Sequence, residues 1–374
     1  MRLAFVLYKY FPYGGLQRDM LRIATACRHA GHDVCIYTMA WEGPEPDGIE
    51  VCRIEVRRIS SHARNRDFGR ELRSRLARAP VDLVVGFNKM PGLDVYYAAD
   101  GCVREKLIAE RTWLSRLAPR YRHFLQYEAA VFAPSSRTEI LMISPRQRDI
   151  FIRHYATPQA RIHMLPPGIA RDRMAGEDAA QLRASFRREF GVSDDDRVIL
   201  CIGSGFKTKG LDRSLQAFAA LPGSLQARSR LVAIGEDNPT AFADRARQLG
   251  VAERFEVLSG RDDIPRILQG GDILLHPAYY ENTGTVLLEA VVAGLPVLTT
   301  DTCGYAFHVE RACAGHVLPS PFSQGDLDTA LADMLESPRR PEWRQNGIEY
   351  GRTQDLYRMP ELAAELMGVL GARR

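Results

Sequence analysis

Two glutamates, Glu281 and Glu289, stand with seven residues between them where a loop runs into a predicted helix over 285–293. A carboxylate oxygen accepts hydrogen bonds, so each glutamate can hold two neighbouring hydroxyl groups of a sugar. Glu289 lies about one turn inside an apolar helix, where a buried carboxylate needs partners that a ligand can supply. The alternative for Glu289 is a structural role at the helix dipole. The pair predicts a site for a molecule with two diols, a ribose and a transferred sugar.

The residues between the glutamates suit an anion. Gly284 and Thr285 place N–H groups without helical partners at the start of the helix, which favours a diphosphate. Thr283 or Thr285 is the expected N-cap. Asn282 and Thr283 add polar side chains beside Glu281.

A glycine-rich loop at 203–210 follows a predicted strand and carries Lys207 and Lys209. The loop lacks the Gly-Lys-Ser/Thr order of a nucleotide-triphosphate P-loop, which argues against an ATPase. A lysine here can neutralise a diphosphate leaving group. The alternative is a solvated basic loop.

A similar turn near the N-terminus contains Gly14 and Gly15, between a strand and a helix. Paired glycines let a backbone approach a phosphate or a sugar closely, and a tight turn with positive φ is the other interpretation. The spacing is not the Gly-x-Gly-x-x-Gly fingerprint, which disfavours a nicotinamide dehydrogenase.

Strand and helix patterns alternate along the chain, which predicts an α/β protein with parallel sheets. The 374 residues are too many for one typical domain. Leu165-Pro166-Pro167-Gly168 and the polar stretch 170–178 predict a linker between two doubly wound, Rossmann-like domains. We expect domains over 1–167, with a C-terminal helix at about 352–374, and over 168–351, with ligands in the interdomain cleft. The predicted strands are 3–8, 33–38, 82–86, 95–99, 141–144, 197–202, 230–235, 255–258, 273–276 and 296–299.

Composition excludes several classes of protein. Seven scattered cysteines without a C-x-x-C pair predict reduced thiols and no metal site. The net charge of +4 fits an acidic small molecule without requiring nucleic acid. The first apolar run is too short for a signal peptide and no run is long enough to span a membrane, so a cytoplasmic location is expected.

The segment 103–123 is basic, with interleaved apolar residues. Such a pattern is typical of a helix that lies on an anionic membrane surface, and an ordinary surface helix is the alternative. The residues expected to face the membrane are Arg104, Lys106, Arg111, Trp113, Arg116 and Arg120.

The E-x7-E element resembles that of the retaining glycosyltransferases of family 4, which have the GT-B fold of two Rossmann-like domains. More narrowly, the chain resembles lipopolysaccharide core glycosyltransferases that add the first hexose to inner-core heptose. Long, unusual strings carry this resemblance across essentially the whole chain. They are Leu7 to Asp19, Gly86 to Tyr96, Leu165 to Ile169 and Cys303 to Ala306.

The resemblance implies roles for individual residues. Glu281 would hold the donor hexose and Glu289 the ribose, while Arg173 and Lys209 would bind the diphosphate. Gly15 and Asp19 would contact the donor's phosphate and sugar. Asp100 would contact the transferred sugar, and Arg261 would lie near the nucleotide.

Two departures from the family leave questions open. The family's Arg-Lys-Gly is Thr208-Lys209-Gly210 here, so Lys207 is a candidate for the missing charge. Asn282 and Thr283 replace small apolar residues, so the donor is UDP-glucose or UDP-N-acetylgalactosamine.

The resemblance implies retaining transfer without a metal, at the cytoplasmic face of the inner membrane, onto a heptosylated lipid A-core acceptor. A UDP-sugar epimerase of the same double fold and a non-catalytic nucleotide-sugar-binding protein are the alternatives.

Overall fold

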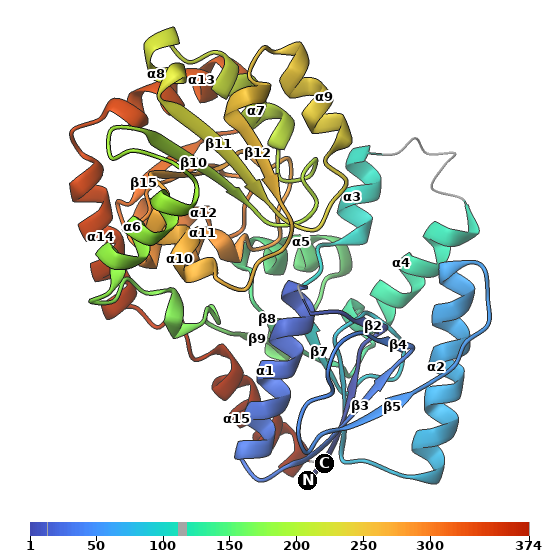
Figure 1. Ribbon diagram of the computed structural model, residues 1–374. Helices are drawn as coiled ribbons and strands as arrows, with labels where there is room; N and C mark the ends of the chain where they lie inside the picture. Colours follow the sequence, from blue (N-terminus) through green and yellow to red (C-terminus); the bar gives the residue numbers. More distant parts are fainter. Residues whose placement is uncertain (13, 111–117, 374) are drawn as a thin grey trace. The chain divides into compact units, whose positions relative to one another are not determined.

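The computed structural model describes residues 1–12, 14–110 and 118–373 (Figure 1). The chain divides into two compact units, Met1–Gly168 with Arg358–Arg374, and Ile169–Tyr357. Each unit has its own parallel sheet covered by helices, which confirms the predicted α/β class and the two Rossmann-like domains of a GT-B protein. No helix in the described ranges is long and apolar enough to cross a membrane.

The sheet of the first unit has seven strands in the order β5-β3-β1-β6-β7-β8-β9, and its neighbouring pairs are parallel. Parallel strands are buried on both faces, which explains why their sequences are continuous apolar runs. The strands are β1 (Arg2–Val6), β3 (Asp33–Thr38), β5 (Glu50–Arg53), β6 (Leu83–Gly86), β7 (Val95–Ala98), β8 (Glu139–Met142) and β9 (Ile162–Met164), and a separate pair is formed by β2 (Lys9–Tyr10) and β4 (Ala40–Trp41).

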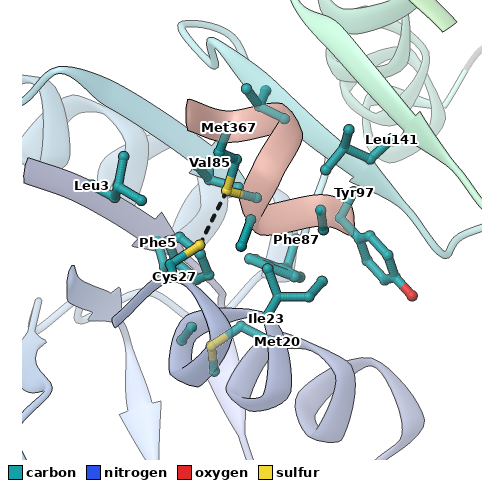
Figure 2. Close-up of a cluster of buried hydrophobic side chains, with 14 of the residues drawn as sticks. Leu3, Phe5, Met20, Ile23, Cys27, Val85, Phe87, Tyr97, Leu141 and Met367 are labelled. Carbon is teal, nitrogen blue, oxygen red and sulfur yellow. Dashed lines mark hydrogen bonds between the residues drawn. The ribbon is translucent and has the colours of Figure 1, made fainter. Parts of the chain in front are cut away.

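Helices cover both faces of this sheet. On one face α1 (Gly15–His29) and α15 (Met359–Ala372) pack together over β1 and β6, as Figure 2 shows for Met20, Cys27 and Met367 around Phe5 and Val85. The other face is covered by α2 (Ser61–Arg78), α4 (Pro119–Phe132) and α5 (Pro145–Tyr155). The remaining short elements of the unit are α3 (Val103–Glu110) and η2 (Gln159–Arg161).

The second unit has six parallel strands in the order β12-β11-β10-β13-β14-β15. Its strands are β10 (Arg197–Ile202), β11 (Ser229–Ile234), β12 (Phe255–Leu258), β13 (Ile273–His276), β14 (Val297–Thr300) and β15 (Gly315–Leu318). The chain leaves β10 toward β11 on one side and returns to β13 on the other. This reversal is the topological switch point, where ligands bind beyond the carboxyl ends of the strands.

Two apolar layers hold the helices on this sheet. Phe186, Ile267 and Leu287 belong to one layer, and Leu215 and Leu331 belong to the other. The helices are α6 (Ala179–Glu189), α7 (Leu211–Ala219), α8 (Gly223–Ala227), α9 (Thr240–Gln248), α10 (Ile264–Gly270), α11 (Thr285–Val292), α12 (Ala306–Arg311), α13 (Gln324–Glu336) and α14 (Arg340–Thr353), with η3 (Arg171–Arg173) and η4 (Ala252–Arg254) between them.

Side-chain hydrogen bonds explain where predicted strands end early. β1 stops at Val6 rather than Tyr8, because the Tyr8 N–H donates to the Asn88 side chain at 2.8 Å. β8 stops at Met142 rather than Ser144, because Ser144 is the N-cap of α5 and accepts from the Gln147 N–H at 3.3 Å.

The units divide between Gly168 and Ile169, one residue after the expected boundary, and the polar stretch 170–178, which was predicted to be part of the linker, belongs to the second unit. This stretch contains η3 and packs on the second unit, where Ile169 is buried and the Ala175 N–H donates to Val292 O at 3.1 Å. The C-terminal segment of the first unit starts at Arg358, later than the expected 352, because α14 continues to Thr353 and packs against α11.

Candidate active site

The loops after β10 and β13 meet at the switch point. The Tyr279 N–H donates to Thr208 O at 2.9 Å, which joins the two loops through their backbones. Gly210 makes this approach possible, since a Cβ there would lie 2.1 Å from Pro277 O. Its φ of 79° also favours glycine. The fold therefore brings the glycine-rich lysine loop to the first glutamate.

Lys209 and Glu281 form an ion pair across this junction. Lys209 Nζ lies 2.5 Å from Glu281 Oε2, and both side chains are about one-fifth exposed, at 21% and 22%. The lysine side chain lies against Gly203, where a Cβ would come within 2.7 Å of Lys209 Cε. The lysine predicted to bind the diphosphate and the glutamate predicted to bind the hexose are thus in direct contact.

The environment keeps the Glu281 carboxylate ionised. Burial alone would raise its pKa, but the nearby His276 imidazole and the charge of Lys209 lower the pKa from 4.5 to about 2. The carboxylate is therefore an acceptor of hydrogen bonds at neutral pH, as binding to sugar hydroxyls requires.

The helix start between the glutamates is built on Gly284. Gly284 is the N-cap of α11, with φ 77°, and no side chain caps the helix, so the predicted capping by Thr283 or Thr285 is wrong. Asn282, Thr283 and Thr285 are half-buried. Without a capping side chain, the first N–H groups of α11 remain suited to an anion.

Glu289 is only 6% exposed, and α11 carries it among apolar neighbours. Arg173, from η3, places its Nε 3.5 Å from Glu289 Oε1. The structure therefore brings together two residues that were predicted to bind the donor. They meet because η3 packs against α11, a contact that the sequence did not reveal.

The two other predicted cations of the second unit have different partners. Lys207 is exposed and bonds Asp212 at 2.6 Å and Tyr279 at 3.3 Å. Arg261 pairs with Asp263 at 2.7 Å and Glu189 at 3.5 Å. Lys209, not Lys207, is the lysine that reaches Glu281.

In the first unit, the predicted residues lie at the carboxyl edge of the sheet. Asp19, on α1, accepts a hydrogen bond from Tyr97 OH at 2.8 Å, and Asp100 is exposed just after β7. Gly14 is the N-cap of α1 with φ −86°, so Gly14 itself is not in the left-handed region. A Cβ at Gly15 would meet nothing within 4 Å, which leaves space beside the start of the helix.

The basic segment is partly tied down. Arg104 is exposed but donates to His154 O at 2.8 Å and lies 4.9 Å from the Tyr155 ring, so it holds α3 on α5. Lys106 and Arg120 are exposed, and Ile108 is 52% exposed. The other predicted membrane residues, Arg111, Trp113 and Arg116, lie outside the described residues.

Two residues of the site were missed from the sequence. His276, the last residue of β13, is buried and lies 3.5 Å from Glu281 Oε2, and Cys303 forms a bridge with Glu281 beside it. The sequence signal that could have pointed to His276 is that this polar residue ends the otherwise apolar strand β13. Among the described side chains, no three His, Cys, Asp or Glu residues are arranged to hold a metal.

Comparisons with known proteins agree with this fold. The model of the family "Glycosyltransferase Family 4" matches residues 13–173, and that of "Glycosyl transferases group 1" matches 183–354. The chain is 44% identical, over 98% of both chains, to the lipopolysaccharide glucosyltransferase WaaG of Escherichia coli K12. A crystal structure of WaaG, also 44% identical, has a TM-score of 0.94 and covers 97% of this chain and 99% of that one.

More distant structures share the fold. The structure of Anabaena HepE in complex with UDP-glucose is 15% identical to this chain and has a TM-score of 0.75. The match covers 99% of this chain and 100% of HepE.

The protein is thus an enzyme of the GT-B glycosyltransferase class. It belongs to glycosyltransferase family 4, and within that family to the glycosyltransferases of lipopolysaccharide biosynthesis. This membership decides against the epimerase and the non-catalytic binding protein.

The lowered pKa of Glu281 predicts how stability depends on pH. Because the folded-state pKa of about 2 lies below the ordinary value of 4.5, the ionised carboxylate stabilises the folded protein above pH 4.5. That contribution is lost as the pH falls from 4.5 toward 2. The difference in unfolding free energy between the wild type and Glu281→Gln should therefore shrink over this window.

Denaturant unfolding of the full chain at a series of pH values measures this difference. Glu253→Gln, which removes an exposed carboxylate from η4, gives the baseline for losing one carboxylate. A difference for Glu281→Gln that stays constant or grows toward low pH would contradict the prediction.

Proposed function

We propose that this protein transfers a hexose from a UDP-sugar to the inner-core heptose of lipopolysaccharide, with retention of configuration at the anomeric carbon and without a metal ion. The observation that carries the proposal is the 2.5 Å contact between Lys209 and Glu281 at the switch point of the second sheet. A cation for the diphosphate beside a carboxylate for the hexose matches the two ends of the bond that must break.

The donor's other half has a matching set of ligands. Glu289 accepts the ribose hydroxyls, and the uncapped start of α11 at Gly284 supplies N–H groups to the diphosphate. Arg173, 3.5 Å from Glu289, adds a second positive charge. Arg261 is assigned to the nucleotide, and Gly14, Gly15, Asp19 and Asp100 of the first unit to the donor phosphate and the transferred sugar.

In the reaction, the bond between the anomeric carbon and the UDP oxygen breaks through an oxocarbenium-like state. The acceptor hydroxyl attacks from the face that UDP leaves, and its proton passes to the departing diphosphate. Lys209, Arg173 and the start of α11 offset the charge that develops on that diphosphate. No metal takes part, because these groups already supply the positive charge.

Glucose is the first candidate for the hexose, because the E. coli relative is a glucosyltransferase and HepE was solved with UDP-glucose. The polar side chains of Asn282 and Thr283 beside Glu281 keep N-acetylgalactosamine as the second candidate, since they can bond an acetamido group or an axial hydroxyl.

The proposal is tested by incubating the enzyme with heptosylated lipid A-core in the presence of EDTA, with UDP-glucose or UDP-N-acetylgalactosamine. We expect transfer from one of these donors, undiminished by EDTA, and a product whose anomeric configuration equals that of the donor by NMR. Loss of activity in EDTA, or an inverted product, would contradict the mechanism, and no transfer from either donor would contradict the proposed activity.

Lys209→Ala should lower turnover by roughly 10²–10³-fold, because one preorganised contact to developing charge contributes about 3–4 kcal/mol. Lys207→Ala, which removes an exposed lysine paired with Asp212, should lower it less than about tenfold. Steady-state kinetics of both variants decides which lysine serves the diphosphate. Equal losses, or near wild-type activity of Lys209→Ala, would show that the assignment to Lys209 is wrong.

The acceptor is a glycolipid, and we propose that the segment 103–123 binds the anionic cytoplasmic face of the inner membrane. The exposed Lys106 and Arg120, with the half-exposed Ile108, support this role. Exposed charges act on a lipid surface within about 10 Å at moderate salt, so the binding should weaken as salt rises.

Sedimentation with anionic and with zwitterionic vesicles tests this surface. The wild type should bind the anionic vesicles preferentially, and the double variant Lys106→Glu/Arg120→Glu should lose most of that binding. Arg245→Glu/Arg352→Glu changes the net charge equally on exposed positions elsewhere and is the matched control. Equal loss in both double variants would mean that only net charge matters.

A further inference from the structure

His276 lies beside Glu281 at the end of a strand. It is the last residue of β13, is 1% exposed, and its Nε2 is 3.5 Å from Glu281 Oε2. That separation is longer than an ordinary N–H···O hydrogen bond of about 2.7–3.2 Å. Among the described residues Nε2 makes no hydrogen bond of good geometry, and the Cys303 side chain is the other neighbour of the imidazole. A buried N–H that lacks a good partner destabilises a protein, so its retention here calls for a reason.

The reason lies in the oxygen that His276 faces. Lys209 Nζ lies 2.5 Å from this same Glu281 Oε2, so a lysine and a histidine approach one carboxylate oxygen and the lysine holds it. Lys209 has a long, flexible side chain, whereas His276 sits on a strand whose backbone is fixed. The Thr299 hydroxyl donates to His276 O at 2.9 Å, and the same hydroxyl contacts Cys303 Sγ at 3.4 Å.

A diphosphate at the start of α11 competes with Glu281 for Lys209, since the phosphates carry more negative charge than the carboxylate. Once Lys209 moves to the diphosphate, Glu281 loses its short contact while it is still largely buried. An ionised carboxylate without a partner in such a place is strongly destabilised. The His276 imidazole lies 3.5 Å from the vacated oxygen and can donate a hydrogen bond to it.

We propose that His276 is a positioning residue, which takes over Glu281 Oε2 when the donor's diphosphate draws Lys209 away. This inference rests on the proposed function, in which Lys209 binds the diphosphate and Glu281 holds the hexose. His276 then keeps the carboxylate oriented toward the sugar hydroxyls during transfer. It also couples the two halves of the donor, because the hexose ligand becomes available only after the diphosphate has bound.

The exchange can be observed without turnover. In imidazole ¹⁵N–¹H NMR spectra, UDP should shift the His276 Nε2–H signal of the wild type, as its hydrogen bond to Glu281 shortens. In Lys209→Met the lysine is absent, so His276 is already bonded to Glu281 and UDP should leave its signal unmoved. Wild-type protein that binds UDP without a shift at His276 would overturn the inference and leave the proposed function standing.

Kinetics supplies the second test. His276→Leu should lower kcat for hexose transfer about 10- to 100-fold, the usual effect of losing a hydrogen bond to a charged group. Its affinity for UDP alone should stay within about threefold of the wild type, a difference well under 1 kcal/mol. His276→Gln, whose amide N–H can replace Nε2–H, should recover most of the lost kcat.

His308→Leu is the matched control, since His308 is also buried in the second unit and bonds Tyr350 OH at 2.6 Å, away from Glu281. It should lower thermal stability as His276→Leu does but leave kcat unchanged. Equal kcat in His276→Leu and the wild type, or no recovery with glutamine, would overturn the inference. A wild type that binds no UDP would overturn the proposed function itself.

Discussion

The reversal of strand order between β10 and β13 is the constraint on which the proposed donor site depends. At this point adjacent parallel strands send their following loops to opposite sides, and a gap opens at the carboxyl edge of the sheet. The loop after β10 brings Lys209 and the loop after β13 brings Glu281, and they meet because Gly210 allows the backbones to touch. The order of the strands therefore determines where the site lies, and the two loops supply its side chains.

Burial of two negatively charged side chains is the second feature of the site. Glu281 and Glu289 are both largely buried carboxylates, and each has a cation from a distant part of the chain, Lys209 and Arg173. A buried carboxylate is stable only with such partners. When the donor's diphosphate takes a cation from its carboxylate, the protein must supply another hydrogen bond to that carboxylate. In our proposal His276 supplies this hydrogen bond to Glu281.

The first unit uses a buried ion pair for a different purpose. Lys89 Nζ lies 2.7 Å from Glu128 and 2.7 Å from Gly101 O, and Glu128 accepts hydrogen bonds from the first N–H groups of α3, at Val103 and Arg104. The start of the basic segment is thereby fixed to α4 and to the loop after β6. Because Gly101 follows Asp100, the same pair also fixes the loop that carries a predicted sugar ligand.

The sequence by itself determined the α/β class, and it supplied the candidate residues of the proposed donor site. Local signals sufficed: apolar runs mark the buried strands, and glycines mark the loops that follow them. The ion pairs of Lys209 with Glu281 and of Arg173 with Glu289 were decided only by tertiary structure, because each joins segments far apart in the chain.

The predictions that were wrong or missing also concerned features that tertiary structure decides. Threonine propensity predicted a side-chain cap for α11, whereas the N-cap residue is Gly284, which has no side chain. Polar composition predicted a linker over 170–178, whereas packing against α11 made it part of the second unit. His276 escaped notice since its meaning depends on a 3.5 Å distance to Glu281, which no periodicity encodes. Sequence patterns specify which groups are available, and long-range packing decides which of them meet.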